Sequence, residues 1–221
     1  MQDLPDLVLL LGLGLGTGLL AYLLGSFPTG YLVVRALKGV DIRTLGSGST
    51  GATNVLRNAG KGPAAIVFGV DIAKGVLAVW LAGTIALQPT GFSEYMPVLQ
   101  CWGGGMALLG HSRPIWLNFQ GGKSVATGLG VLFALNWMIG LSAFGCFGLM
   151  LALFRIVSVG SIVAALSVNG LMWGLGQPLA YKIFALLGGG YVIWRHKGNI
   201  QRLLAGQEPR IGEAIPSKAD S

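Results

Sequence analysis

The sequence is poor in charged side chains. Of its 221 residues only 10% are charged, with eight acidic residues against fifteen Lys and Arg. An ordinary soluble domain carries about 25% charged residues, so this chain falls outside that class. The basic residues are too few to cover a nucleic-acid-binding surface, and they lie at the ends of apolar runs. We therefore expect no nucleic-acid partner and read the positive charge as facing an anionic membrane surface or a phosphorylated substrate.

The scarcity of acids, histidines and cysteines excludes several kinds of catalytic site. Neither histidine, His111 or His196, has an acid five positions on, so the H-x-x-x-x-D pattern of the common membrane-associated acyltransferases is absent. No carboxylate pair is spaced for acid–base work, and no Cys/His spacing indicates zinc. The stretch "GSTGATNVL" lacks the spacing of a nucleotide-binding P-loop. A polar site in this chain must consist mainly of cations, hydroxyls and backbone amides.

Long apolar runs make up most of the chain instead. A membrane-spanning helix needs roughly 20 mostly apolar residues, and 53% of this sequence is hydrophobic. The stretch 125–154 is long enough for one long helix or two short ones. The candidate spans are 7–25, with a possible continuation toward 37, 64–87, 95–110, 125–138, 139–154, 156–176 and 178–194. We interpret residues 1–221 as one all-α domain embedded in the lipid bilayer.

The distribution of Lys and Arg predicts the topology, because these residues accumulate in cytoplasmic loops. If 125–154 forms two helices that turn at Asn136, the chain has seven spans and most basic residues fall on one side. If it forms one, the basic C-terminal segment lies on the other side. We therefore expect seven transmembrane helices with the N-terminus out and the C-terminus in. The residues on the inner side are Arg35, Lys38, Arg43, Arg57, Lys61, Arg113, Lys123, Arg155, Arg195, Lys197, Arg202, Arg210 and Lys218.

Four unusual polar segments lie on this basic side. The first, "LGSGSTGATNVLRNAGKG" at 45–62, has no acid. Its Ser47, Gly48, Thr53 and Asn54 let backbone amides and hydroxyls approach an anion, and Arg57 adds a guanidinium. A Gly/Ser segment of this kind can also serve only as a connection. The absence of acids nevertheless favours an anion-binding loop.

The second segment, "GHSRPIWLNFQGGKSVATG", places Gly121, Gly122 and Lys123 before an expected helix start. A helix N-terminus attracts phosphate, so this loop is a second candidate for anion binding. The alternative for Lys123 is a simple anchor at the membrane surface.

The third and fourth segments place polar residues three apart. Arg155, Ser158 and Ser161 would share a helical face at the inner membrane edge, and His196 and Asn199 have the same spacing near the C-terminus. Their alternatives are an anchoring Arg with serines bonded to their own helix, and a basic interfacial tail.

Two charges, Asp71 and Lys74, lie three apart inside an expected span. Charges within a bilayer are costly and usually paired. We expect an internal ion pair that fixes this helix, rather than a contact with substrate.

These segments together resemble those of the bacterial membrane glycerol-3-phosphate acyltransferases that use acyl phosphate as donor. "LGSGSTGATNVLR" is similar to the family pattern G-S-G-N-x-G-A-T-N-x-x-R, and "GHSRPIWLNFQGGKSVAT" to G-H-x-x-P-x-x-x-x-F-x-G-G-K-x-x-A-T. "DIAKG", "RIVSVGS" and "HKGNIQRLLAGQE" extend the resemblance over nearly the whole chain. The sequence departs from the family at Ser49, where Asn is usual, and at Lys197, where Arg is usual.

The resemblance implies transfer of an acyl group from acyl phosphate to the sn-1 hydroxyl of glycerol 3-phosphate, giving lysophosphatidic acid and inorganic phosphate. This is the first step of bacterial phospholipid synthesis. It places the protein in the plasma (inner) membrane with the active site on the cytoplasmic side. It implies no metal and no organic cofactor. The expected partners are acyl phosphate, glycerol 3-phosphate and the lipid bilayer.

The expected site has two groups of residues. The catalytic group is Ser47, Lys123, His196 and Asn199. The substrate-binding group is Gly48, Thr53, Asn54, Arg57, Gly121, Gly122 and Ser161. We expect a phosphate oxygen of the donor to accept the hydroxyl proton, with His196 as general base the competing hypothesis.

A small membrane transporter for phosphorylated solutes is the alternative function. It also explains charges within the membrane and basic loops. No inverted repeat is visible in the sequence, and the polar residues gather at one face of the membrane, which favours the enzyme.

Overall fold

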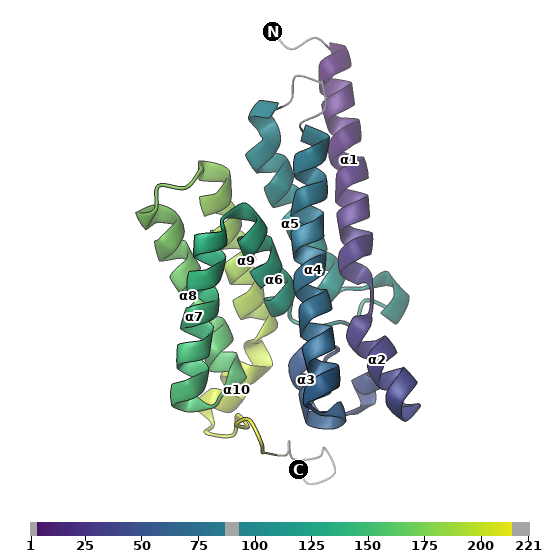
Figure 1. Ribbon diagram of the computed structural model, residues 1–221, viewed down its shortest axis with the longest axis vertical. Helices are drawn as coiled ribbons and strands as arrows, with labels where there is room; N and C mark the ends of the chain where they lie inside the picture. The colour runs from purple at the N-terminus through teal and green to yellow at the C-terminus, as the bar shows by residue number, and fades with distance from the viewer. Residues whose placement is uncertain (1–3, 87–92, 214–221) are drawn as a thin grey trace.

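The computed structural model describes residues 4–86 and 93–213, and the regular elements among these residues are all helical. Figure 1 shows the long helices running roughly antiparallel to one another. The α-helices are α1 (Leu4–Ser26), α2 (Thr29–Lys38), α3 (Ala52–Ala59), α4 (Lys61–Ala86), α5 (Met96–Ser112), α6 (Val125–Leu135), α7 (Trp137–Phe154), α8 (Val157–Gly174), α9 (Leu179–Arg195) and α10 (Lys197–Leu204). Three single-turn helices, η1 (Ile42–Thr44), η2 (Ser93–Tyr95) and η3 (Ile115–Leu117), lie in connections.

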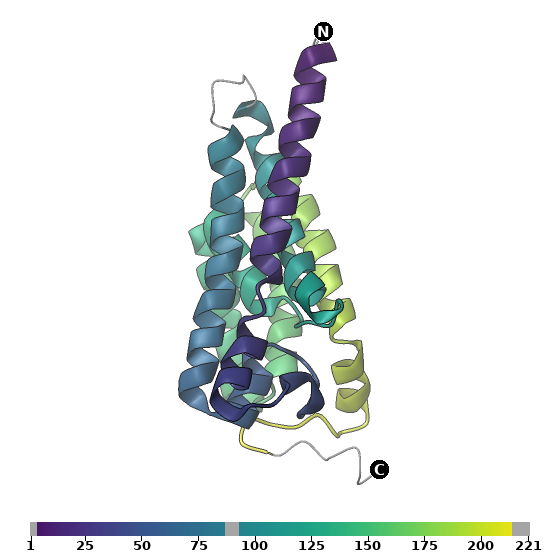
Figure 2. The ribbon, with the colours of Figure 1, turned by 90° about the vertical axis from the view of Figure 1, so that its right-hand side faces the viewer.

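The long helices form two groups joined through α6 and by a contact of α5 with α9. Helix α1 packs on α4 and α5, while α7, α8 and α9 pack in sequence, and α6 contacts both α4 and α7. The short helices α2, α3 and α10 all lie at the same end of the bundle, the lower end in Figures 1 and 2. The polar segments of the sequence therefore meet at one end.

Four segments of the described chain are long and apolar enough to cross a membrane: Val8–Lys38, Lys61–Ala86, Trp137–Phe154 and Val157–Gly174. Large apolar side chains such as Leu15, Trp80 and Leu186 are more than 60% exposed, as expected of a surface that faces lipid. Helices α5 and α9 have 17 residues each and α6 has 11. Because α6 rises only about 16 Å against a hydrocarbon core of about 30 Å, seven crossings stay a prediction.

The helix bounds lie close to the predicted spans, and they decide two points that the sequence left open. The first helix does not continue toward residue 37, because the chain breaks at Phe27–Pro28 and α2 starts at Thr29. The turn between α6 and α7 falls at Asn136, whose side chain accepts hydrogen bonds from the backbone amides of Met138 and Ile139. This confirms the two-helix interpretation of 125–154. Residue 87, the predicted end of the second span, and Lys218 lie outside the described residues.

The predicted ion pair within α4 is confirmed. Lys74 Nζ lies 2.6 Å from Asp71 Oδ1, and both side chains are buried. Lys74 also donates to the carbonyl of Phe27, at 2.6 Å. The ammonium thus donates a hydrogen bond to the backbone at the break between α1 and α2, where the regular hydrogen bonding of α1 has ended.

Candidate active site

A polar pocket opens among the connections at the end of the bundle where α2, α3 and α10 gather. About 800 Å³ of space outside atoms lies in it, including solvent space at its open mouth. Residues from all four predicted polar segments line it, so the structure brings together parts of the chain far apart in sequence. The expected site residues among its lining are Ser47, Thr53, Asn54, Arg57, Lys123, Ser161, His196 and Asn199. Gly48, Gly121 and Gly122 do not line it, and they shape the two loops behind it.

Asn54 holds the first loop in shape. Its side chain is buried, and its amide nitrogen donates to the carbonyls of Leu45, at 3.0 Å, and Ser49, at 2.8 Å. Its Oδ1 accepts from the amide of Ser47 at 3.2 Å. Gly48 has a positive φ of 68°, which favours glycine. The hydrogen bonds of the Asn54 side-chain amide are therefore used within the loop, where they position Ser47.

Helix α3 begins at the wall of the pocket. Gly51, its N-cap, and the first two helical residues, Ala52 and Thr53, line the cavity. A helix N-terminus carries a partial positive charge, so this wall favours an anion. Arg57, one turn further on, is half-buried, and desolvation lowers the pKa of its guanidinium, which nevertheless remains charged.

The loop before α6 is clamped at Gly122. Its amide donates to the carbonyl of His111, at 3.1 Å, and its carbonyl accepts from Arg195 Nη2 at 2.8 Å. A Cβ added at Gly121 or at Gly122 would collide with His111. The close approach explains why this pair of residues is glycine, and it fixes the direction of the next residue, Lys123.

Lys123 reaches across the pocket to α10. Its Nζ donates to Asn199 Oδ1 at 2.6 Å. Burial lowers the pKa of the Lys123 ammonium to about 8, against the opposing attraction of Glu208. The amine is therefore mostly charged at neutral pH and titrates just above it.

Glu208 is a pocket residue that sequence reasoning missed. Its Oε1 accepts from Ser158 Oγ at 2.7 Å and from Asn199 Nδ2 at 2.6 Å, and its Oε2 accepts from Arg202 Nε at 2.8 Å. It thereby orients the amide of Asn199 so that Oδ1 faces Lys123. Glu208 lies past the end of α10, and no local spacing in the sequence indicated its partners.

His196 joins α9 to α10 and is buried. Its Nδ1 lies 2.7 Å from the carbonyl oxygen of Val192. A carbonyl only accepts, so Nδ1 carries the proton of the neutral ring and Nε2 is left as an acceptor. Burial and the nearby Lys123 charge lower the pKa of His196 to about 4. The ring is therefore neutral at physiological pH.

The third polar segment is only partly as predicted. Ser158 and Ser161 line the pocket from α8, and Ser161 Oγ donates to the carbonyl of Val157. The prediction that Arg155 shares their helical face is wrong. Arg155 has φ 60° at the end of α7, and α8 begins only at Val157, so the chain turns between them. The Arg155 side chain instead donates to the carbonyl of Ile211.

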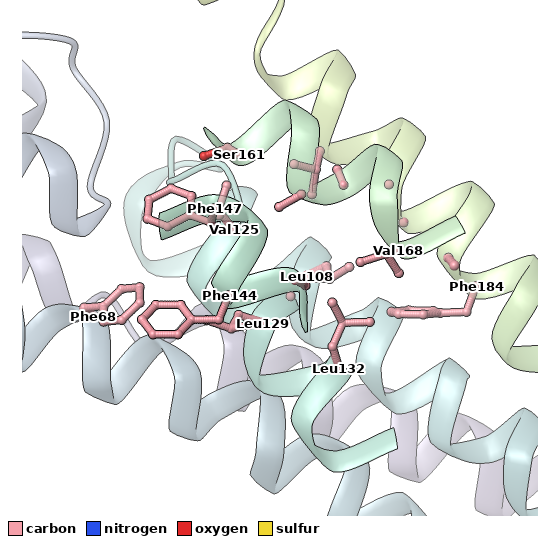
Figure 3. Close-up of a pocket in the computed structure, with 18 residues that line it drawn as sticks. Phe68, Leu108, Val125, Leu129, Leu132, Phe144, Phe147, Ser161, Val168 and Phe184 are labelled. Carbon is pink, nitrogen blue, oxygen red and sulfur yellow. The ribbon is translucent and has the colours of Figure 1, made fainter. Parts of the chain in front are cut away.

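An apolar cavity adjoins the polar pocket. About 710 Å³ of space outside atoms lies in it, including space at its open side, and it shares Phe68, Val125, Phe147 and Ser161 with the polar pocket. Figure 3 shows Ser161 at one end of this cavity, with the aromatic and aliphatic side chains of the lining extending away from it. A pocket lined by polar and basic side chains thus continues directly into an apolar space.

Comparison with known proteins gives a family match over most of the chain. The family model described as Glycerol-3-phosphate acyltransferase matches residues 15–206. The protein named Glycerol-3-phosphate acyltransferase from Nostoc sp. (strain PCC 7120) is 53% identical over 211 residues, which cover 91% of this chain and 93% of that protein. The protein of the same name from Synechococcus elongatus is 58% identical over 201 residues, covering 89% and 94%.

Two solved structures share the fold. Both are described as PlsY (YgiH), an integral membrane glycerol 3-phosphate acyltransferase, one in the glycerol 3-phosphate form and one in the lysophosphatidic acid form. The first has a TM-score of 0.81 at 37% identity, covering 90% of this chain and 96% of that one. The second has a TM-score of 0.79 at 36% identity, covering 90% and 95%.

Proposed function

Because this chain belongs to the family of bacterial membrane glycerol-3-phosphate acyltransferases, we propose that it transfers an acyl group from acyl phosphate to the sn-1 hydroxyl of glycerol 3-phosphate. The products are lysophosphatidic acid and inorganic phosphate. The observation that carries the proposal is the direct junction of a cationic pocket with an apolar cavity. A donor with a phosphate head and an acyl tail matches both halves.

The first loop holds the donor phosphate. Ser47 supplies a hydroxyl, Gly48 allows the tight turn, and Thr53 lies at the N-terminus of α3. Backbone and hydroxyl donors hold a phosphate without a metal ion, and the helix dipole adds to their attraction. Asn54 supports this arrangement from behind, through its hydrogen bonds to the loop.

The remaining polar side chains of the pocket bind glycerol 3-phosphate. Arg57 and Lys123 supply positive charge for its phosphate, with Gly121 and Gly122 positioning the lysine. Ser161, His196 and Asn199 are within the same pocket and offer acceptors and donors to its hydroxyls. The acyl chain of the donor lies in the apolar cavity beyond Ser161.

The chemical step follows from this placement. The sn-1 oxygen attacks the acyl carbonyl carbon, a new ester bond forms, and the bond from the carbonyl carbon to the phosphate oxygen breaks. The hydroxyl proton passes to a phosphate oxygen, so inorganic phosphate leaves with that proton. Holding the two reactants in attack geometry contributes about 7–11 kcal/mol in favourable cases, which reduces the need for a protein base.

His196 orients the hydroxyl and does not remove its proton. A ring with a pKa of about 4 is a weak base at neutral pH, and a phosphate with a second pKa of about 6 is a better acceptor. The variant His196→Ala tests this assignment. We expect a slow enzyme that added imidazole does not rescue. Rescue by imidazole would make His196 the general base and remove the substrate-assisted step.

The protein lies in the plasma membrane with seven spans, the N-terminus outside and the pocket at the cytoplasmic face. The concentration of Lys and Arg at the pocket end of the bundle supports this orientation. In this proposal the short helices α5, α6 and α9 complete the seven crossings.

Purified protein in detergent tests the activity. With acyl phosphate and glycerol 3-phosphate we expect equal amounts of inorganic phosphate and lysophosphatidic acid. The same protein with acyl-CoA as donor should give none. Formation of lysophosphatidic acid from acyl-CoA alone would overturn the donor assignment. Uptake of glycerol 3-phosphate into vesicles, without any product, would favour the transporter instead.

A further inference from the structure

The apolar cavity has a defined depth. Three of the helices that line it do so over similar stretches: residues 125–132 on α6, 161–168 on α8 and 184–192 on α9. Each stretch is about two helical turns, which is roughly 10–12 Å. In Figure 3, Ser161 marks the end next to the polar pocket, and Val168, Leu132 and Phe184 lie toward the other end. The cavity therefore runs inward along the bundle from the polar pocket for two turns.

The inner end of the cavity is a packed floor. Ala143, Val168 and Ala185 line the cavity and belong to a hydrophobic cluster with Ile139 and Met172. Ile139 and Met172 are fully buried. A hydrocarbon chain that reaches this level meets close-packed side chains, and passing further would require them to separate.

We propose that this floor sets the length of acyl chain that the protein prefers, with Val168 and Gly188 as specificity-determining residues. The inference rests on the proposed function, since it concerns the tail of the acyl-phosphate donor. A chain longer than the cavity must fold back or leave sideways between helices. Either route loses contacts that a shorter chain keeps. The kcat/KM for acyl phosphates should therefore fall once the acyl chain exceeds the length of the cavity.

Gly188 controls the width of the cavity. A Cβ added there lies 3.6 Å from both Leu108 Cδ1 and Phe184 Cζ, which is ordinary van der Waals contact. A larger side chain at this position fits the fold by occupying cavity space. Gly190, two residues on, is exposed and does not line the cavity, and a Cβ there meets nothing within 4 Å. It is the matched control on the same helix.

The experiment compares kcat/KM for saturated acyl phosphates of increasing length among the wild type, Gly188→Leu, Gly190→Leu and Val168→Ala. We expect Gly188→Leu to lower the ratio of long-chain to short-chain kcat/KM tenfold or more, because one or two methylenes in a pocket have effects of this size. Val168→Ala should move the preferred length upward. Gly190→Leu should leave the profile unchanged.

The KM for glycerol 3-phosphate serves as the folding control and should stay within about twofold in each variant. An unchanged length profile in both Gly188→Leu and Val168→Ala, with activity retained, overturns the inference and leaves the proposed function standing. If one variant loses its fold, the other decides. A wild type that consumes no acyl phosphate of any length overturns the proposed function, and the inference with it.

Discussion

Lys123 is held by a chain of hydrogen bonds and not by a direct ion pair. Its Nζ donates to Asn199, whose amide nitrogen donates to Glu208. The carboxylate therefore orients the lysine through a neutral amide. The positive charge of Lys123 stays available to a phosphate because no carboxylate contacts it directly among the described side chains.

Replacing Lys123 by Met should weaken glycerol 3-phosphate binding. A lost hydrogen bond from a charged group is worth about 1.5–3 kcal/mol, so we expect KM to rise roughly 10- to 150-fold. Steady-state kinetics with glycerol 3-phosphate varied at saturating donor measure it. Lys182→Met is the control, since Lys182 lies over the Trp173 ring, away from the pocket. An unchanged KM in Lys123→Met would remove the residue from the site.

The same lysine should give the enzyme an alkaline limit. Burial sets the pKa of Lys123 at about 8, below the usual value for lysine. Its charge is present below pH 8 and is lost above it, so kcat/KM for glycerol 3-phosphate should fall above pH 8, approaching about tenfold per unit. Lys123→Arg keeps its charge to much higher pH. In that variant kcat/KM for glycerol 3-phosphate should stay level up to pH 9, whatever its absolute value. If kcat/KM still falls above pH 8 in Lys123→Arg, another group causes the fall.

Glu208→Gln should loosen the pocket while keeping its shape. The amide retains the size of the side chain but offers one acceptor oxygen where the carboxylate has two, against three donors from Ser158, Asn199 and Arg202. We expect a loss of about 1–3 kcal/mol of stability and a raised KM for glycerol 3-phosphate. Thermal unfolding in detergent and steady-state kinetics measure the two effects. Glu213→Gln, outside the pocket, is the control, and equal behaviour of the two variants would contradict this role.

The site residues that the sequence predicts lie in recognisable local patterns, whereas the one that it misses, Glu208, does not. Lys123 stands out because two glycines precede it at an expected helix start, and His196 and Asn199 stand out because they lie three residues apart after an apolar run. Glu208 looks like one more acid in a polar tail, and its three partners come from α8 and α10. A contact between segments 50 residues apart leaves no periodic trace in the sequence, so only the folded chain shows it.

At the scale of helices, hydrophobic runs and turn residues predict the bounds well, since each long helix begins or ends near a polar residue that lipid excludes. The break at Phe27–Pro28 was harder to place. A hydrophobic run continues through it, and the carbonyl of Phe27 is satisfied by Lys74 from another helix. The function of Lys74 at this break could not be read from its spacing to Asp71 alone.

Lys74→Met should destabilise the protein strongly. It leaves Asp71 buried without its ammonium partner, and the Phe27 carbonyl keeps only the backbone amide of Thr29 as a donor. Breaking one partner of a buried pair costs about 3–5 kcal/mol. Thermal unfolding in detergent should show this loss. The double variant Asp71→Leu with Lys74→Met removes both charges and should recover part of the lost stability. If it recovers none, the loss comes from the missing hydrogen bond at the α1–α2 break and not from the unpaired carboxylate.

At the scale of the whole molecule, the proposed membrane topology can be tested directly by labelling from one side of the membrane. Lys38, at the end of α2, lies at the pocket end of the bundle, and Ser93 lies at the start of η2, near the opposite end (Figure 1). Both are exposed. In a variant whose Cys101 and Cys146 are replaced by Ala, a cysteine at Ser93 should react with an impermeant maleimide on intact cells. A cysteine at Lys38 should react only after permeabilisation, and the reverse pattern would invert the topology.

The residues that the two cavities share have a consequence for how reactants reach the site and how product leaves it. In the proposed reaction, glycerol 3-phosphate would arrive by diffusion through water, whereas acyl phosphate would travel within the plane of the bilayer. The two would meet beside Phe68, Val125, Phe147 and Ser161, the residues that line both cavities. Lysophosphatidic acid formed there would have its head at the aqueous surface and its tail among lipids, so it would enter the leaflet by lateral diffusion without a soluble carrier.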